Sequence, residues 1–129
     1  MIYISPPLAA KGLILVDRGD PGAYDWTLND FTRDNNPHEL DCSGIVPAGA
    51  KMIRFIVSTK NNAAEETGII GKNGNTNWYN AFEFTTPGAS IQQRWQGDVF
   101  CDTDRKVRYL FTATTWNVIN LTVLGWFML

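Results

Sequence analysis

Stretches that alternate apolar and polar side chains with a period of two constrain the fold of this chain more than any other feature. The clearest is KMIRFIVSTK, residues 51–60, where Ile53, Phe55 and Val57 share one face of an extended strand. KVRYLFTAT (106–114) and WNVINLTVLGW (116–126) follow the same rule. No window of a dozen residues carries the apolar stripe of a helix without a break. The pattern predicts an all-β protein.

The third alternating stretch predicts which of its side chains form the core. Counting by two, the inward-facing residues are Ile119, Leu121 and Val123, and the outward-facing ones are Trp116, Asn120 and Thr122. In 106–114, Val107, Tyr109 and Phe111 share a face.

Weaker strands are expected at 12–16, 24–28, 39–42, 68–72, 78–84 and 91–100, separated by segments rich in Gly, Pro, Asn and Asp. Eight or nine short strands joined by turns favour a two-sheet antiparallel β-sandwich, jelly-roll-like, with a strand order that the pattern does not give. Residues 12–129 are expected to form this single domain. The preceding residues 1–11 contain an apolar segment with Pro6-Pro7 and are expected to be a docking arm.

The composition favours association with other proteins. Apolar residues make up 44% of the 129 residues and charged residues only 19%, below the roughly 25% of a typical domain. The net charge is −2 and the basic residues are scattered, which argues against a nucleic-acid partner. The apolar C-terminal stretch is about half as long as the roughly 20 residues of a membrane-spanning helix, so no membrane span is expected.

Five tryptophans exceed what one small core needs, and GWFML ends the chain with consecutive bulky side chains. We therefore expect a homo-oligomer whose subunit or partner interface uses Ile2, Tyr3, Ile4, Trp116, Trp126 and Phe127.

The segment KNGNTNWYN, residues 72–80, has two interpretations. Asn73-Gly74 is a strong turn signal, which favours a simple connection between strands. Alternatively, amides beside an aromatic ring suit a sugar, and the candidate ligand-binding residues are Asn75, Asn77, Trp78 and Asn80. If 78–84 is a strand, Trp78 and Tyr79 lie on opposite faces and only one of them serves a given surface.

Other patterns point to structure more than to chemistry. The tripeptide Arg18-Gly19-Asp20 and the carboxylates of DRGDPGAYD (17–25) match a solvated loop better than an adhesion motif or a calcium site. Asp102 and Asp104 are expected to cap the backbone amides of their own turn. His38 has no nucleophile motif beside it, and Glu65, Glu66 and Glu83 form an acid/base pair only if the fold brings them together. No enzyme activity, cofactor or metal is expected.

Cys42 and Cys101 form a disulfide only in an oxidising compartment. The N-terminus lacks a basic segment before its apolar part and does not match a secretory signal, so two reduced thiols are the default.

The order GIVPAGAK, KNGNTNWYN, CDTDRKVRY and WNVINLTVLGW, over roughly residues 40–126, resembles small β-sandwich modules of bacteriophage and prophage virion proteins, of the tail-fibre, head-fibre or decoration type. The resemblance implies a non-enzymatic sandwich in the virion, assembled in the host cytoplasm, commonly as a trimer, on other virion proteins. The alternative is a carbohydrate-binding, receptor-binding module with a glycan partner.

Overall fold

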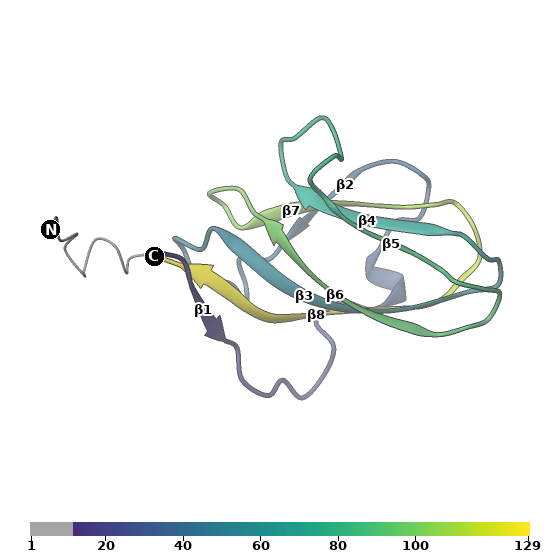
Figure 1. The fold of residues 1–129 in the computed structure, drawn as a ribbon, viewed down its shortest axis with the longest axis horizontal. Helices are drawn as coiled ribbons and strands as arrows, with labels where there is room; N and C mark the ends of the chain where they lie inside the picture. The colour runs from purple at the N-terminus through teal and green to yellow at the C-terminus, as the bar shows by residue number, and fades with distance from the viewer. Residues whose placement is uncertain (1–11) are drawn as a thin grey trace, which may run out of the picture.

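The computed structural model describes residues 12–129, and its strands form two sheets of four that face each other (Figure 1). One sheet has the order β1-β8-β3-β6 and the other β2-β7-β4-β5. The elements are β1 (Ile14–Asp17), the 3-10 helix η1 (Leu28–Asp30), β2 (His38–Asp41), β3 (Met52–Asn61), β4 (Thr67–Lys72), β5 (Phe82–Thr85), β6 (Gln93–Phe100), β7 (Lys106–Phe111) and β8 (Trp116–Met128). The predicted all-β sandwich is confirmed.

The strand pairing is that of a rolled hairpin. β1 pairs with β8, β2 with β7, β3 with β6 and β4 with β5, all antiparallel, as in one long two-stranded ribbon folded at β4–β5. The ribbon is rolled so that successive pairs lie alternately in one sheet and in the other. Pairing of β3 with β8 completes the first sheet, and pairing of β4 with β7 completes the second. This is the jelly-roll arrangement.

The core lies between the sheets, where the predicted alternation places it. Side chains at every second position of β3, β7 and β8 are buried. These are Ile53, Phe55, Val57, Val107, Tyr109, Phe111, Ile119, Leu121 and Val123. Phe31, just after η1, completes an aromatic cluster by meeting Tyr109 and Phe111 edge to face at centroid distances of 5.0 and 5.2 Å.

Trp116 corrects the prediction for the last strand, because it is buried at 3% exposure and not turned outward. Strand β8 has a register shift against β3 at each end: Lys60 pairs with Val118, but Asn61 pairs with Trp116. The skipped Asn117 is a β-bulge, which moves the residues beyond it to the opposite face. A second shift skips Leu124 and turns Trp126 toward the core, against which it packs while half-buried.

Two weaker strands were placed wrongly. Residues 24–28 make only an isolated bridge between Trp26 and Leu121 before η1 begins. The backbone N–H of Thr27 donates to the Asp30 carboxylate at 2.7 Å, which turns the chain away from β8 into the 3-10 helix. The strand expected at 78–84 begins only at Phe82.

The loop after β1 is fastened to β8 by a partly buried ion pair. Arg18 donates to both carboxylate oxygens of Asp25, and Asp25 also accepts the backbone N–H of Val123 at 2.8 Å. The Arg18 side chain is therefore occupied within the fold, which disfavours the adhesion interpretation of Arg18-Gly19-Asp20. The predicted arm, residues 1–11, lies outside the described residues, and no helix within 12–129 is long and apolar enough to cross a membrane.

Candidate functional site

Residues 73–81 form a long loop between β4 and β5 that contains the predicted ligand-binding residues. Its first turn is closed by the Asn75 N–H, which donates to the Lys72 carbonyl at 3.2 Å. Gly74 has a φ of 94°, whereas Asn73 is not among the residues of positive φ. The predicted turn is present, but only its glycine adopts the left-handed conformation, so it is not the hairpin turn in which both central residues do.

A second turn explains why strand β5 begins late. The Ala81 N–H donates to the Trp78 carbonyl at 3.1 Å, so residues 78–81 curve instead of extending. The alternation rule does not apply to a turn, so the prediction that Trp78 and Tyr79 lie on opposite faces of a strand loses its basis. Both residues line the same hollow.

Two adjoining hollows, each of about 520 Å³, lie on this loop and share Thr76, Asn77 and Tyr79. The first is also lined by Ile69, Trp78, Ala81 and Glu83, and the second by Gly74, Asn75 and Asn80. The four residues predicted from the sequence, Asn75, Asn77, Trp78 and Asn80, therefore lie around one continuous region. Tyr79 stands between the hollows with 98% of its surface exposed.

The Trp78 ring packs against Arg108 of β7, a residue that the sequence analysis did not single out. The guanidinium lies over the indole at 3.8 Å from the ring centroid and donates to the Asn77 carbonyl at 2.8 Å. The ring also covers Gly71, where an added Cβ would approach its carbons to 3.3 Å. The loop thus presents its tryptophan in a fixed position, which lowers the entropy cost of binding a ligand.

The base of the loop is fastened to the turn before β7. The Asn73 amide donates to Asp102 Oδ2 at 3.0 Å, and Asp102 Oδ1 accepts the backbone N–H groups of Asp104 and Lys106. Burial alone would raise the pKa of Asp102, but these hydrogen bonds hold it below its usual value. The expected capping role of Asp102 is confirmed.

A second surface lies on the other sheet, as a row of apolar side chains that crosses all four strands at one end. Leu15 pairs with Phe127, Phe127 with Met52, and Met52 with Phe100. Directly paired residues share a face of the sheet, and the next residues, Ile53 and Val99, are buried. The row Leu15–Phe127–Met52–Phe100, here called the end row, therefore faces away from the core.

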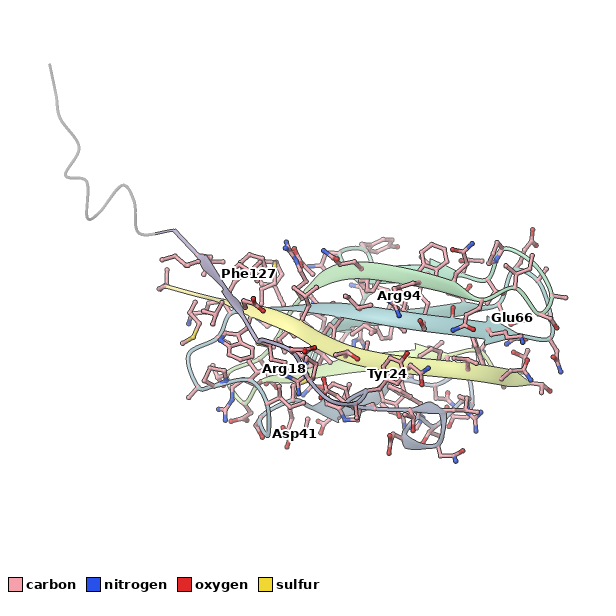
Figure 2. The ribbon with its side chains drawn as sticks, turned by 90° about the horizontal axis from the view of Figure 1, so that it is seen from below. Arg18, Tyr24, Asp41, Glu66, Arg94 and Phe127 are labelled. Carbon is pink, nitrogen blue, oxygen red and sulfur yellow. The ribbon has the colours of Figure 1, made fainter. Side chains whose placement is uncertain are left out.

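The end row is partly open to solvent. Leu15 is 36% and Phe100 46% exposed. Figure 2 shows Phe127 at the end of the molecule where β1 lies, with Arg94 farther along the same sheet. The Arg54 guanidinium lies over the Phe127 ring at 5.2 Å and is paired with Asp98 at 2.7 Å, so a charged pair borders the row on one side.

The predicted interface residues separate into three groups. Phe127 belongs to the end row. Trp126 packs against the core and Trp116 is inside it, so Trp116 offers no surface to a partner. Ile2, Tyr3 and Ile4 lie outside the described residues.

A third hollow, of about 600 Å³, lies on the outer face of the same sheet, between residues 19–24 and Ile56, Arg94 and Thr122. The acidic loop forms its wall, but Asp25 is paired with Arg18 and Asp17 accepts the Gly19 N–H at 2.8 Å. Within residues 12–129, no three His, Cys, Asp or Glu side chains are grouped as metal ligands.

Two of the remaining candidate groups, His38 and Glu66, have structural partners. His38 Nε2 lies 2.8 Å from Asp34 Oδ1, and Glu66 accepts the Thr112 hydroxyl at 2.6 Å. Cys42 and Cys101 are free and buried, and burial raises the pKa of both thiols.

Comparison of the chain with protein-family models and with curated proteins found no match.

Proposed function

We propose that this chain is a non-enzymatic assembly protein that associates with copies of itself and attaches to other proteins of a virion. The observation that carries the proposal is the end row: four apolar side chains in register across a whole sheet, of which Leu15 and Phe100 are exposed. An apolar row of this kind on the outer face of a sheet is a candidate surface for protein–protein contact.

Two further points support the same proposal. The order of motifs over roughly residues 40–126 resembles phage virion modules, which implies particle assembly and a location in the virion. The rolled strand order is one that viral capsid domains use. Lectin domains use it too, so the fold alone does not choose between assembly and sugar binding.

Carbohydrate binding is the second candidate, and the turn at residues 78–81 favours it. This turn brings Trp78 and Tyr79 to one hollow together with Asn77, where the strand pattern had separated the two rings. Sugar rings stack on such aromatic faces while their hydroxyl groups hydrogen-bond to amides and carboxylates. Glu83 supplies a carboxylate at the same hollow.

A crossed pair of substitutions separates the two functions, because each surface contains an exposed aromatic ring. Phe100→Ser removes a ring from the end row, and Tyr79→Ser removes one from the loop; both lie outside the core at 46% and 98% exposure. Sedimentation velocity is expected to show weaker self-association for Phe100→Ser only. A glycan array is expected to show lost binding for Tyr79→Ser only, if the loop binds sugar. Equal self-association of wild type and Phe100→Ser would remove the end row as an assembly surface.

A further inference from the structure

The loop between β4 and β5 lies over an outer sheet face that combines apolar and polar side chains. Ile69 of β4 pairs with Glu83 of β5, and Gly71 of β4 pairs with Arg108 of β7. Ile70, between the two paired β4 residues, belongs to the core, so the paired residues lie on the outer face. Ile69 is nevertheless only 8% exposed. The loop therefore covers this part of the face, and the hollow beside it has an apolar side at Ile69 and a carboxylate at Glu83.

The charge around the two hollows of this loop favours a neutral ligand. Among the described residues that line them, Glu83 is the only charged one, and its side chain is exposed. The guanidinium of Arg108 is occupied by the Trp78 ring and the Asn77 carbonyl. A carboxylate accepts hydrogen bonds from hydroxyl groups and repels an anion. The lining therefore suits a ligand rich in hydroxyl groups and without negative charge.

The number of polar groups distinguishes a sugar from a proline-rich peptide, which also packs on tryptophan and tyrosine. Besides Glu83, the lining contains a threonine and three asparagines. These are Thr76, Asn75, Asn77 and Asn80. Proline has no N–H to donate, so a proline-rich segment would leave most of these groups without a partner. A sugar ring offers an apolar face to the aromatic rings and hydroxyl groups around its edge.

We propose that this loop binds a neutral oligosaccharide of at least two sugar units, one on each side of Tyr79. The inference rests on carbohydrate binding, the second candidate function above, and specifies the class of glycan. Each hollow, at about 520 Å³, is by itself within the roughly 300–1,000 Å³ of small-ligand sites. The hollows share Thr76, Asn77 and Tyr79, and the loop projects from the sandwich (Figure 1), so a sugar chain can extend from one to the other.

The two hollows differ in their polar groups and therefore in what they contribute. In the first, a sugar unit packs on Trp78 and donates a hydroxyl hydrogen bond to Glu83. In the second, the residues that the first does not share include Asn75 and Asn80, whose amides bind the hydroxyl groups of the next unit. Tyr79, almost fully exposed between them, contacts both units.

Arg108 acts as a positioning residue for Trp78. Its Nε is buried and has no hydrogen-bond partner in the part of the chain that the structure describes. An unpaired buried donor lowers stability, and its presence in a native fold calls for a reason. The fixed position of the Trp78 ring, which the same guanidinium contacts at 3.8 Å, supplies that reason.

Binding measurements on the full chain test the ligand class and the two subsites. The probes are a glycan array with neutral and sialylated oligosaccharides and a polyproline decapeptide. Calorimetry then compares the best-bound oligosaccharide with its own terminal monosaccharide. We expect the bound glycans to be neutral, and the oligosaccharide to bind at least about tenfold more tightly than the monosaccharide, because it also contacts the second hollow.

Two substitutions test the residues that carry the proposal. Glu83→Gln keeps the shape of the side chain and is expected to weaken oligosaccharide binding about tenfold. Glu65→Gln, which removes an exposed carboxylate that does not line the hollows, is the matched control and should leave the affinity unchanged. Arg108→Lys keeps the charge but not the planar contact with the indole, so it should weaken binding and change the near-ultraviolet circular dichroism of the tryptophans while the far-ultraviolet spectrum is retained.

The possible failures are distinguishable. Equal affinity for the oligosaccharide and its monosaccharide would overturn the two subsites and leave sugar binding in one hollow. A preference for sialylated glycans, or binding of the polyproline peptide instead of any glycan, would overturn the ligand class. Full affinity in Arg108→Lys would overturn its positioning role. If no glycan binds, carbohydrate binding falls together with this inference, and assembly through the end row is unaffected.

Discussion

Replacing Trp116 with alanine tests whether the β-bulge at Asn117 buries the indole. The side chain is 3% exposed, packs edge to face on Phe111 at 5.3 Å, and donates from Nε1 to the Thr112 carbonyl at 2.9 Å. Removing a buried tryptophan costs about 3–5 kcal/mol in the free energy of unfolding. The lost hydrogen bond adds about 1 kcal/mol. Since domains are stable by about 5–15 kcal/mol, Trp116→Ala should lose a large part of the total.

Urea denaturation followed by far-ultraviolet circular dichroism measures this loss. We expect a decrease of at least about 3 kcal/mol, which lowers the melting temperature by roughly 10 °C or more. Tyr79→Ala, at 98% exposure, is the control and should change stability by less than about 0.5 kcal/mol. A loss below about 1 kcal/mol for Trp116→Ala would refute the bulge, because it would mean that the indole faces solvent as plain alternation places it.

Three further predictions follow from local geometry. An added Cβ on Gly125 would lie 2.3 Å from the Val16 carbonyl oxygen. Gly125→Ala should therefore displace β1, speed amide exchange at residues 14–17 and weaken self-association. Unchanged amide exchange at these residues would contradict the β1–β8 contact. Cys42 and Cys101 should react with a thiol reagent only after unfolding, since both are buried and their thiol pKa is raised; rapid labelling of the native protein would show that one is accessible. The pKa values of Asp34, Asp41 and Asp102 lie below the ordinary value of an aspartate. A hydrogen bond with His38 lowers the pKa of Asp34, and hydrogen bonds with Ser43 lower that of Asp41. Burial raises the pKa of Asp102, but hydrogen bonds, chiefly with Asn73, outweigh this effect. As pH falls, these carboxylates take up protons in the unfolded chain before they do so in the folded one. The stability that they contribute is therefore present above about pH 4 and is lost as pH falls below it. A free energy of unfolding that does not decline between about pH 5 and about pH 2.5 would argue against these bonds.

The sequence predicted the sandwich because the long strands are regular. In β3 and β7 each apolar residue at alternating positions is buried, and side-chain alternation alone is enough to find that face. Alternation failed in β8. The bulges at Asn117 and Leu124 place the side chains beyond them, at both ends of the strand, on the opposite face from the one that alternation predicts. No local pattern in WNVINLTVLGW marks these bulges, since they depend on the pairing with β3.

The loop at 73–81 was only partly predictable. Asn-Gly indicated a turn, and the four candidate residues do lie around adjoining hollows. The second turn at 78–81 was missed because Trp, Tyr and Phe favour strands, and this preference concealed the change of direction. Arg108 could have been found: between Val107 and Tyr109, which face the core, it must lie on the outer face, where a long cation needs a partner.

The sequence contains a pattern that points to the end row and was not used in the prediction. Four strands carry two adjacent apolar residues near the same end of the sheet: Leu15-Val16, Met52-Ile53, Val99-Phe100 and Trp126-Phe127. One member of each pair must face away from the core. Only the register shows that the four outward members stand in one line, and the register comes from long-range pairing that sequence reasoning does not give.

Self-association of the wild-type chain is the central claim, and multi-angle light scattering over a concentration series measures it most directly. We expect a molar mass that rises above the 14.5 kDa of one chain as concentration increases. A mass that stays at 14.5 kDa up to about 1 mM, the concentration at which a contact of only about 4 kcal/mol would be half formed, would contradict it.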